Sequence, residues 1–354
     1  MRRGLVSWSR EEVPAAVLER RVSVLQRAMA EQGFDAVVAY TSTVQPAAVS
    51  WLTQFVPYSN DGLLLVFPEG PPALFASFSK RVQGWIKEVS RVGEVGLGPK
   101  FAHAAVKMLK ERTAASNQAP RIGFIGPDRI PAPVMEPFIE AGWEGNLLDA
   151  GELFARVRQP VDESEAKLLQ RTAAMARQAL DAIPAGASRA SQVLSAIERT
   201  ARLAGAEEVF PRIASDLASS GSLVRMEGDS ALEARFAVQI SLAYKGVWVR
   251  AARCVARGGV SQSWSAAESW FRGAVSRLRA DRLGLPDDAP GKIALWKIES
   301  CLASEPFTVV GDGTALPPGS FGVASVELAL PDGPWHGCST FILGSGREAT
   351  RLLG

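Results

Sequence analysis

The sequence contains few of the residues on which common catalytic sites depend. It has only two histidines, His103 and His336, among 354 residues. Catalytic zinc sites usually use two or three His ligands, and the chain has no HExxH run. It also has no GxSxG turn, which a serine hydrolase of the α/β type would place at its nucleophile. These absences argue against HExxH zinc peptidases and against Ser/His/Asp hydrolases.

Cysteines and long apolar runs are scarce as well. The three cysteines, Cys254, Cys301 and Cys338, are far apart and form no CxxC motif. A disulfide would leave one thiol over, which favours reduced, buried cysteines in a cytoplasmic protein. No stretch approaches the roughly 20 apolar residues of a membrane span, and the N-terminus has no signal-peptide run. We therefore expect a cytoplasmic chain with no membrane partner.

An excess of charge of either sign is also missing. The 39 Lys and Arg residues are balanced by 37 Asp and Glu residues, which gives a net charge of +2. Bulk electrostatics therefore provides no case for a nucleic-acid partner. The chain is long enough for two domains of ordinary size, each with its own core.

The first part of the chain alternates predicted strands and helices. A helix at 13–33 ends at Gly33, and further helices are expected near 80–88, 102–115 and 132–141. Strands are expected at 35–40, 62–67, 72–78, 93–97 and 121–126. This alternation predicts an α/β domain with a mixed or parallel sheet over residues 1–157.

The pattern changes after a polar, Pro-containing connector at 156–162. Asp162 or Ser164 caps a predicted helix that runs to 183, and a second helix is expected at 188–204. Strands are predicted at 208–213, 321–330 and 340–343, with one helix at 263–283. We therefore expect an α+β domain at 158–354, with helices on one side of an antiparallel sheet.

The run from 235 to 255 predicts a β-hairpin in this second domain. Its first strand alternates apolar side chains with small or polar ones, which is typical of a half-buried strand. Tyr244, Lys245 and Gly246 form the expected turn. If the loop has two or four residues, we expect Gln239 to lie directly opposite Arg250, on the face away from the aliphatic row.

Several runs, in the same order along nearly the whole chain, resemble the M24 metallopeptidase superfamily of creatinase, prolidase and aminopeptidase P. They are residues 20–40, the SWLTQF segment at 50–55, the helix-forming run 156–182, Ile183-Pro-Ala-Gly, Phe210-Pro-Arg-Ile-Ala-Ser, and Gly228-Asp229 with the hairpin. The resemblance implies a creatinase N-terminal-like α/β domain at 1–157 and an α+β pita-bread domain at 158–354. It also makes the segment from 253 to 296 look short, as if one helix were missing.

The same resemblance implies a site in which two Asp, one His and two Glu hold two divalent metals. Gln239 and Arg250 stand at the two Asp positions, and Trp296 stands at the His position. Glu327 matches one Glu, and the other Glu falls on or beside Gly337. A substrate-binding His of the family is replaced by Ala303.

An Arg guanidinium is not a metal ligand, and one carboxylate cannot hold two hard divalent cations. We therefore expect no metal cofactor, and we predict that Arg250 pairs with Glu327 while Gln239 bonds nearby. This pair would be structural or would hold a carboxylate ligand. Trp296 would fill the core or stack on a planar ligand. His336, in an expected turn between two strands, would lie at the surface or at the rim of the site.

The sequence thus predicts an M24-like pseudo-peptidase that lacks the dinuclear metal site and acts by binding a peptide, a small molecule or a protein partner. The expected ligand-binding residues are Gln239, Arg250, Trp296, Glu327 and His336. A metal-independent hydrolase and an inactive subunit of an active M24 paralogue are the alternatives. A homodimer, or a pair with such a paralogue, is the expected assembly.

Overall fold

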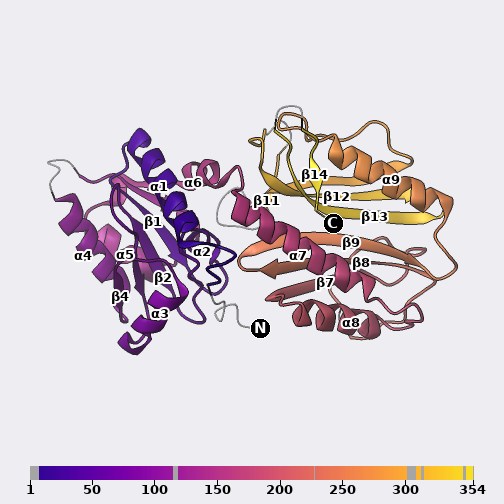
Figure 1. The fold of residues 1–354 in the computed structure, drawn as a ribbon, viewed down its shortest axis with the longest axis horizontal. Helices are drawn as coiled ribbons and strands as arrows, with labels where there is room; N and C mark the ends of the chain where they lie inside the picture. Colours follow the sequence, from indigo (N-terminus) through magenta and orange to yellow (C-terminus); the bar gives the residue numbers. More distant parts are fainter. Residues whose placement is uncertain are drawn as a thin grey trace. The chain divides into compact units, whose positions relative to one another are not determined.

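The structure is a computed structural model that describes residues 8–114, 119–226, 228–300, 308–311, 315–345 and 348–353. These residues form two compact units, one ending at Arg158 and the other beginning at Gln159 (Figure 1). Within the described ranges, no helix has the length and apolar character needed to cross a membrane.

A six-stranded mixed sheet forms the centre of the first unit, in the order β4-β3-β2-β1-β5-β6. Parallel pairs join β3 to β4, β1 to β5 and β5 to β6, whereas the β1–β2 and β2–β3 pairs are antiparallel. The predicted α/β unit with a mixed sheet is confirmed. Its strands are β1 (Ala36–Thr41), β2 (Gly62–Val66), β3 (Ala73–Ala76), β4 (Val95–Leu97), β5 (Ile122–Ile125) and β6 (Leu147–Asp149).

Helices cover both faces of this sheet. Alternate residues of β1 enter two separate apolar clusters, because successive strand side chains point to opposite faces. Residues of α1, α2 and α6 belong to one cluster, and residues of α4 and α5 belong to the other. The helices are α1 (Ala15–Gln32), α2 (Ala47–Thr53), α3 (Gln83–Val89), α4 (Phe101–Thr113), α5 (Ala132–Glu140) and α6 (Gly151–Arg158).

The second unit begins with α7 (Glu163–Asp181) and α8 (Ala190–Leu203). The Asp162 carboxylate accepts a hydrogen bond from the Glu165 amide and so caps α7. A three-stranded antiparallel sheet follows, made of β7 (Glu208–Ala214), β8 (Arg235–Tyr244) and β9 (Val247–Ala256). The aliphatic row of β8 is buried, and α7 packs on β8 and β9.

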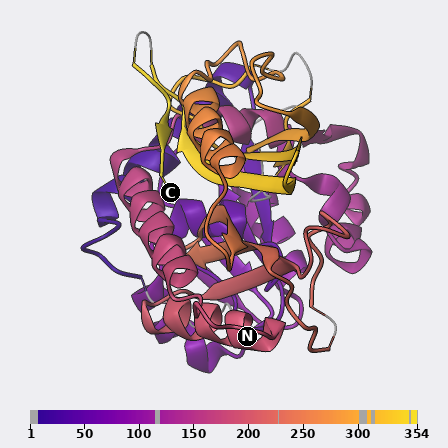
Figure 2. The same cartoon turned by 90° about the vertical axis from the view of Figure 1, so that its right-hand side faces the viewer.

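The rest of the second unit is a five-stranded sheet with α9 (Gln262–Ser276) packed on β12 and β13, as the orange helix in Figure 2 shows. Its strand order is β11-β10-β12-β13-β14. These strands are β10 (Lys292–Ser300), β11 (Thr308–Val309), β12 (Phe321–Leu330), β13 (Gly333–Ile342) and β14 (Arg351–Leu352). All of the connection between β9 and β10 is described, and α9 is its one helix, ending earlier than the predicted residue 283.

The two sheets of this unit meet where β9 lies beside β13, and side chains join these two strands. The Thr340 hydroxyl accepts from the Arg250 amide N–H at 2.9 Å and donates to the Arg250 carbonyl at 3.2 Å. The Cys254 sulfur accepts from the His336 amide at 3.2 Å, and its thiol donates to the His336 carbonyl at 3.6 Å. We call this junction the seam. Here Thr340 and Cys254 bond to backbone groups of the facing strand, as a ladder partner would.

The seam predicts that Thr340 contributes strongly to stability. Thr340→Val keeps the shape of the side chain but removes the hydroxyl that bonds both backbone groups of Arg250. We expect a loss of about 2 kcal/mol in the free energy of unfolding, because buried polar groups lose a partner. Thr340→Ser keeps the hydroxyl and should lose less. Urea denaturation measures both variants, and a Thr340→Val midpoint equal to that of the wild type would contradict the role given to the seam.

Candidate functional site

The hairpin of β8 and β9 has a different register from the predicted one. Lys245 and Gly246 form a two-residue turn with φ values of 47° and 81°, as a type I′ turn requires. This turn places Arg250 directly opposite Ser241. The predicted direct pairing of Gln239 with Arg250 is therefore wrong. Gln239 lies on the same face but further from the turn.

One face of the five-stranded sheet carries a group of polar side chains. Directly paired residues of antiparallel strands point to the same face, so the register defines this group. We call it the polar face. Its members are Lys297 and Glu299 of β10, Ser325 and Glu327 of β12, and His336, Cys338 and Thr340 of β13.

Two transverse rows of residues cross the seam onto the polar face. The first row runs from Arg250 through Thr340 and Val323 to Glu299. The second row runs from Cys254 through His336 and Glu327 to Leu295. The seam and the strand register therefore decide which charged groups can meet.

In the first row, Arg250 forms an ion pair with Glu299. The Arg250 Nε also donates to Ser241 Oγ at 3.0 Å, and Lys297 Nζ lies 3.2 Å from Glu299 Oε1. The Arg250 and Glu299 side chains are only 15% and 7% exposed. No Arg250–Glu327 ion pair occurs among the described residues, so the predicted pair is wrong. Glu327 belongs to the second row, and Glu299 takes its place as the partner.

In the second row, His336 and Glu327 lie directly opposite each other. His336 is part of strand β13 and is only 7% exposed, so its predicted place in a surface turn is wrong. Burial lowers the pKa of His336, while the Glu327 charge and the Gly221 backbone oppose that change. The His336 Nε2 atom is buried and has no hydrogen-bond partner within the described ranges.

Trp296 does not lie on the polar face. It pairs with Val326, on the opposite face of the sheet, and its indole N–H donates to the Leu283 carbonyl at 3.1 Å. Its ring packs edge-on against Trp270 and Phe271 of α9. Trp296 is thus a packing residue beneath α9, which agrees with the core-filling alternative and not with a place on the polar face. The side chain of Lys297, the next residue in β10, lies on the polar face instead.

The comparison with solved structures gives a consistent result. The prolidase from Pyrococcus horikoshii OT3 is similar over 94% of this chain and 97% of that chain, with a TM-score of 0.73 at 15% identity. The Xaa-Pro dipeptidase from Bacillus anthracis is similar over 95% of this chain and 97% of its own, with a TM-score of 0.72 at 17% identity. Icp55 from Saccharomyces cerevisiae is similar over 98% of this chain and 95% of its own, with a TM-score of 0.71 at 10% identity.

The chain has the pita-bread fold. The predicted fold class is confirmed by this similarity, and the neighbours are of the M24 type. No family model and no curated protein matches the sequence.

The polar face of this pita-bread chain does not fit two divalent metals. Arg250 and Lys297 both lie against Glu299, so two cations already surround one carboxylate. Burial raises the pKa of the Cys338 thiol to about 11, which disfavours the thiolate that would bind a metal. No cluster of three or more His, Cys, Asp or Glu suitable for a metal occurs in the part of the chain that the structure describes. Ala303, which the resemblance aligns with a substrate-binding His, lies outside the described residues.

The ion pair in the first row predicts a large effect of Glu299→Gln. This change leaves the buried Arg250 guanidinium and the Lys297 ammonium beside a neutral amide. We expect a loss of about 3 kcal/mol in the free energy of unfolding, because a buried charge loses its countercharge.

The matched control is Glu111→Gln, which breaks an exposed pair with Lys107 on α4 and should cost less than about 1 kcal/mol. Chemical denaturation compares the two variants. Equal losses would show that burial adds nothing to the Arg250–Glu299 pair.

His336 predicts a pH dependence of stability. Its folded-state pKa lies below the ordinary value near 6.5, so the unfolded chain takes up a proton first as the pH falls. The stability that neutral His336 contributes is present above about pH 6.5 and is lost as the pH falls through the folded pKa. The wild type should therefore lose more stability between pH 7 and pH 5 than His336→Asn.

Proton NMR can follow the same group directly, since the chain has only two histidines. His103→Gln removes the other imidazole and assigns the signal of His336. Glu327→Gln should lower the pKa of His336 further, because the Glu327 charge raises it. An unchanged pKa in Glu327→Gln would contradict the coupling within the second row.

Proposed function

We propose that this chain works by binding a ligand on the polar face and has no dinuclear metal-dependent peptidase activity. The observation that carries this proposal is the buried ion pair of Arg250 with Glu299. By the resemblance, Arg250 stands at the position of a metal-binding Asp. A permanently charged guanidinium there repels a divalent cation and satisfies the carboxylate that could attract it.

The ligand that this surface fits best is a short peptide or a small molecule with amide and carboxylate groups. Gln239 lies on β8 of the neighbouring three-stranded sheet, on the same face of that sheet as Arg250. It offers an amide donor and acceptor and makes no hydrogen bond to other described residues through its side chain. The Nε2 of His336 is buried beside Glu327 and has no hydrogen-bond partner among the described residues, so a ligand would reach it only when the side chains that cover it move. Buried polar atoms are nearly always hydrogen-bonded, so a ligand that bonds this nitrogen would gain free energy.

A metal-independent hydrolase is a second candidate, favoured by one observation. His336 is neutral at pH 7 and lies opposite Glu327, the arrangement of a general base with an orienting carboxylate. The hydrolase would use the same polar face without any metal. Glu327 would then hold the imidazolium that forms when His336 takes a proton from water.

The assembly and the location of the chain are also part of the proposal. We infer a cytoplasmic protein that forms a homodimer or pairs with an M24 paralogue. Light scattering of the purified chain tests for the homodimer, and co-purification from its source cell tests for the pair with a paralogue.

The two candidate functions predict different results in one hydrolysis assay. The chain is incubated with Xaa-Pro dipeptides with and without added Mn²⁺ or Co²⁺, and metal content is measured after dialysis. A binding protein should retain no stoichiometric metal and should show no turnover in either condition, while dipeptides still bind in calorimetry. Gln239→Ala should weaken that binding several-fold, by roughly one hydrogen bond.

The other outcomes separate the alternatives. Metal-free turnover that is lost in His336→Asn would establish the hydrolase instead. Stoichiometric metal with metal-dependent turnover would contradict both candidates. An authentic prolidase assayed in parallel provides the positive control for substrate and metal quality.

A further inference from the structure

The segment that follows β7 reaches from the three-stranded sheet to the polar face of the five-stranded sheet. A Cβ atom on Gly221 of this segment would lie 2.7 Å from Oε1 of Glu327 and 3.2 Å from Pro334. The Gly221 backbone also lies beside the imidazole of His336, since it counteracts the lowering of the His336 pKa by burial. A residue without a side chain is needed for so close an approach to the His336–Glu327 pair.

The cover over this pair is local. Leu295 ends the same transverse row and is 45% exposed, whereas His336 is only 7% exposed. The row is therefore open at one end and closed at the other, where Gly221 lies. At the closed end, Nε2 of His336 is buried and has no hydrogen-bond partner among the described residues.

Residues 218–222, which we call the strap, are fixed at both ends to the three-stranded sheet. On one side, Leu217 is 1% exposed and its amide donates to the Arg235 carbonyl at 2.9 Å. On the other side, Val224 exchanges two backbone hydrogen bonds with Ile213, at 2.9 and 3.0 Å. These two points can act as hinges, because the residues between them can move while the anchors stay in place.

The strap itself buries little apolar surface. Its sequence is Ala-Ser-Ser-Gly-Ser, and four of the five residues are exposed. Asp216 shapes its turn, since its carboxylate accepts from the Ala218 amide at 2.8 Å and its carbonyl from the Ser220 amide at 3.0 Å. A segment with few buried apolar contacts opens at low cost in free energy, without unfolding of the domain.

We propose that the strap is a movable cover of the His336–Glu327 pair, which closes the second row against ligands and opens to admit them. This inference rests on the proposed ligand site of the polar face. A ligand that bonds Nε2 of His336 has to offset the cost of opening, so the closed strap lowers the apparent affinity for that ligand.

Diethyl pyrocarbonate, which acylates accessible neutral imidazoles, tests the cover on the full chain without any ligand. His103 provides an internal reference, because its side chain is 58% exposed and the chain has only one other histidine. Mass spectrometry of the digested product gives both rates. We expect His336 to react at least about tenfold more slowly than His103, since a covered group reacts only in proportion to its open population. Equal rates in the wild type would overturn the proposal.

Gly221→Val should hold the strap open, because the added side chain meets Glu327 and Pro334. His336 should then react several-fold faster, while the rate of His103 stays unchanged. Equal acceleration of both histidines would show a general loosening of the chain and would contradict a local cover.

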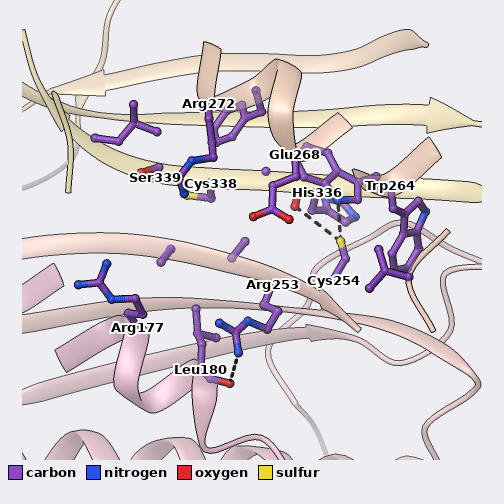
Figure 3. A pocket seen from close by; sticks show the side chains of 17 residues that line it. Arg177, Leu180, Arg253, Cys254, Trp264, Glu268, Arg272, His336, Cys338 and Ser339 are labelled. Carbon is purple, nitrogen blue, oxygen red and sulfur yellow. Dashed lines mark hydrogen bonds between the residues drawn. The ribbon is translucent and has the colours of Figure 1, made fainter. Parts of the chain in front are cut away.

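The matched control is Gly186→Val, since a Cβ atom on Gly186 meets nothing within 4 Å, and it should leave both rates unchanged. Circular dichroism shows whether each variant is folded. An unchanged His336 rate in folded Gly221→Val would overturn the strap. Access would then run elsewhere, for example through a pocket between α7 and α9 that His336 also lines (Figure 3).

A second variant loosens the strap without adding a side chain near the pair. Asp216→Ala removes the carboxylate that accepts from the Ala218 amide, and it should raise the His336 rate by a smaller factor than Gly221→Val. If Gly221→Val does not fold, this variant decides the question. A His336 rate equal to that of the wild type in Asp216→Ala would then overturn the strap.

Calorimetry with the Xaa-Pro dipeptides separates the strap from the ligand site. Gly221→Val should bind them several-fold more tightly than the wild type, because the cost of opening is removed. Faster modification of His336 in Gly221→Val with no dipeptide binding in any variant would support the cover and reject the ligand site. Dipeptide binding together with an unchanged His336 rate in Gly221→Val would support the ligand site and reject the strap.

Discussion

The seam between β9 and β13 is the contact on which the rest of the second unit depends. Two sheets meet there, and strand edges with unmet N–H and C=O groups would be costly to bury. Thr340 and Cys254 each bond an N–H and a C=O of the facing strand. Burial raises the pKa of Cys254 to about 12, which keeps the thiol proton that its donor bond needs. A hydroxyl and a thiol thus fix the relative position of the two strands.

This fixed position decides the electrostatics of the polar face. Because Arg250 is held at the level of Thr340, its guanidinium meets Glu299 and not Glu327. Because Cys254 is held at the level of His336, Glu327 is left opposite the imidazole. The face therefore contains one saturated ion-pair cluster and one buried His–Glu pair. The first surrounds one carboxylate with two cations, which disfavours a divalent metal there, and the second contains a buried Nε2 without a hydrogen-bond partner among the described residues.

Local periodicity was sufficient to predict an α/β unit followed by an α+β unit, most helices and the strands of the hairpin, and the family resemblance added the pita-bread fold. The contacts between side chains of the site were harder to predict, because they depend on the pairing register of strands that are distant in the sequence. The turn shows this: assigning it to Lys245-Gly246 moves the partner of Arg250 to Ser241. Polar Lys297 and Glu299 alternate with Trp296 and Ile298, a period-2 signal that could have placed Trp296 on the apolar face. No local pattern could have paired Arg250 with Glu299, since β9, β13 and β12 all contribute to that alignment.

Strand β13 belongs to two surfaces of the second unit. Its residues 335–339 all line a pocket between α7 and α9, and two of them, His336 and Cys338, are also members of the polar face (Figure 3). A ligand in that pocket and a ligand on the polar face would therefore contact the same strand. Thr340 and Cys254 tie that backbone to β9, and a close-packed interior transmits strain rather than absorbing it. Coupling between the two surfaces would run through β13 itself, and the seam limits it because the hydrogen bonds of Thr340 and Cys254 fix the position of β13 relative to β9.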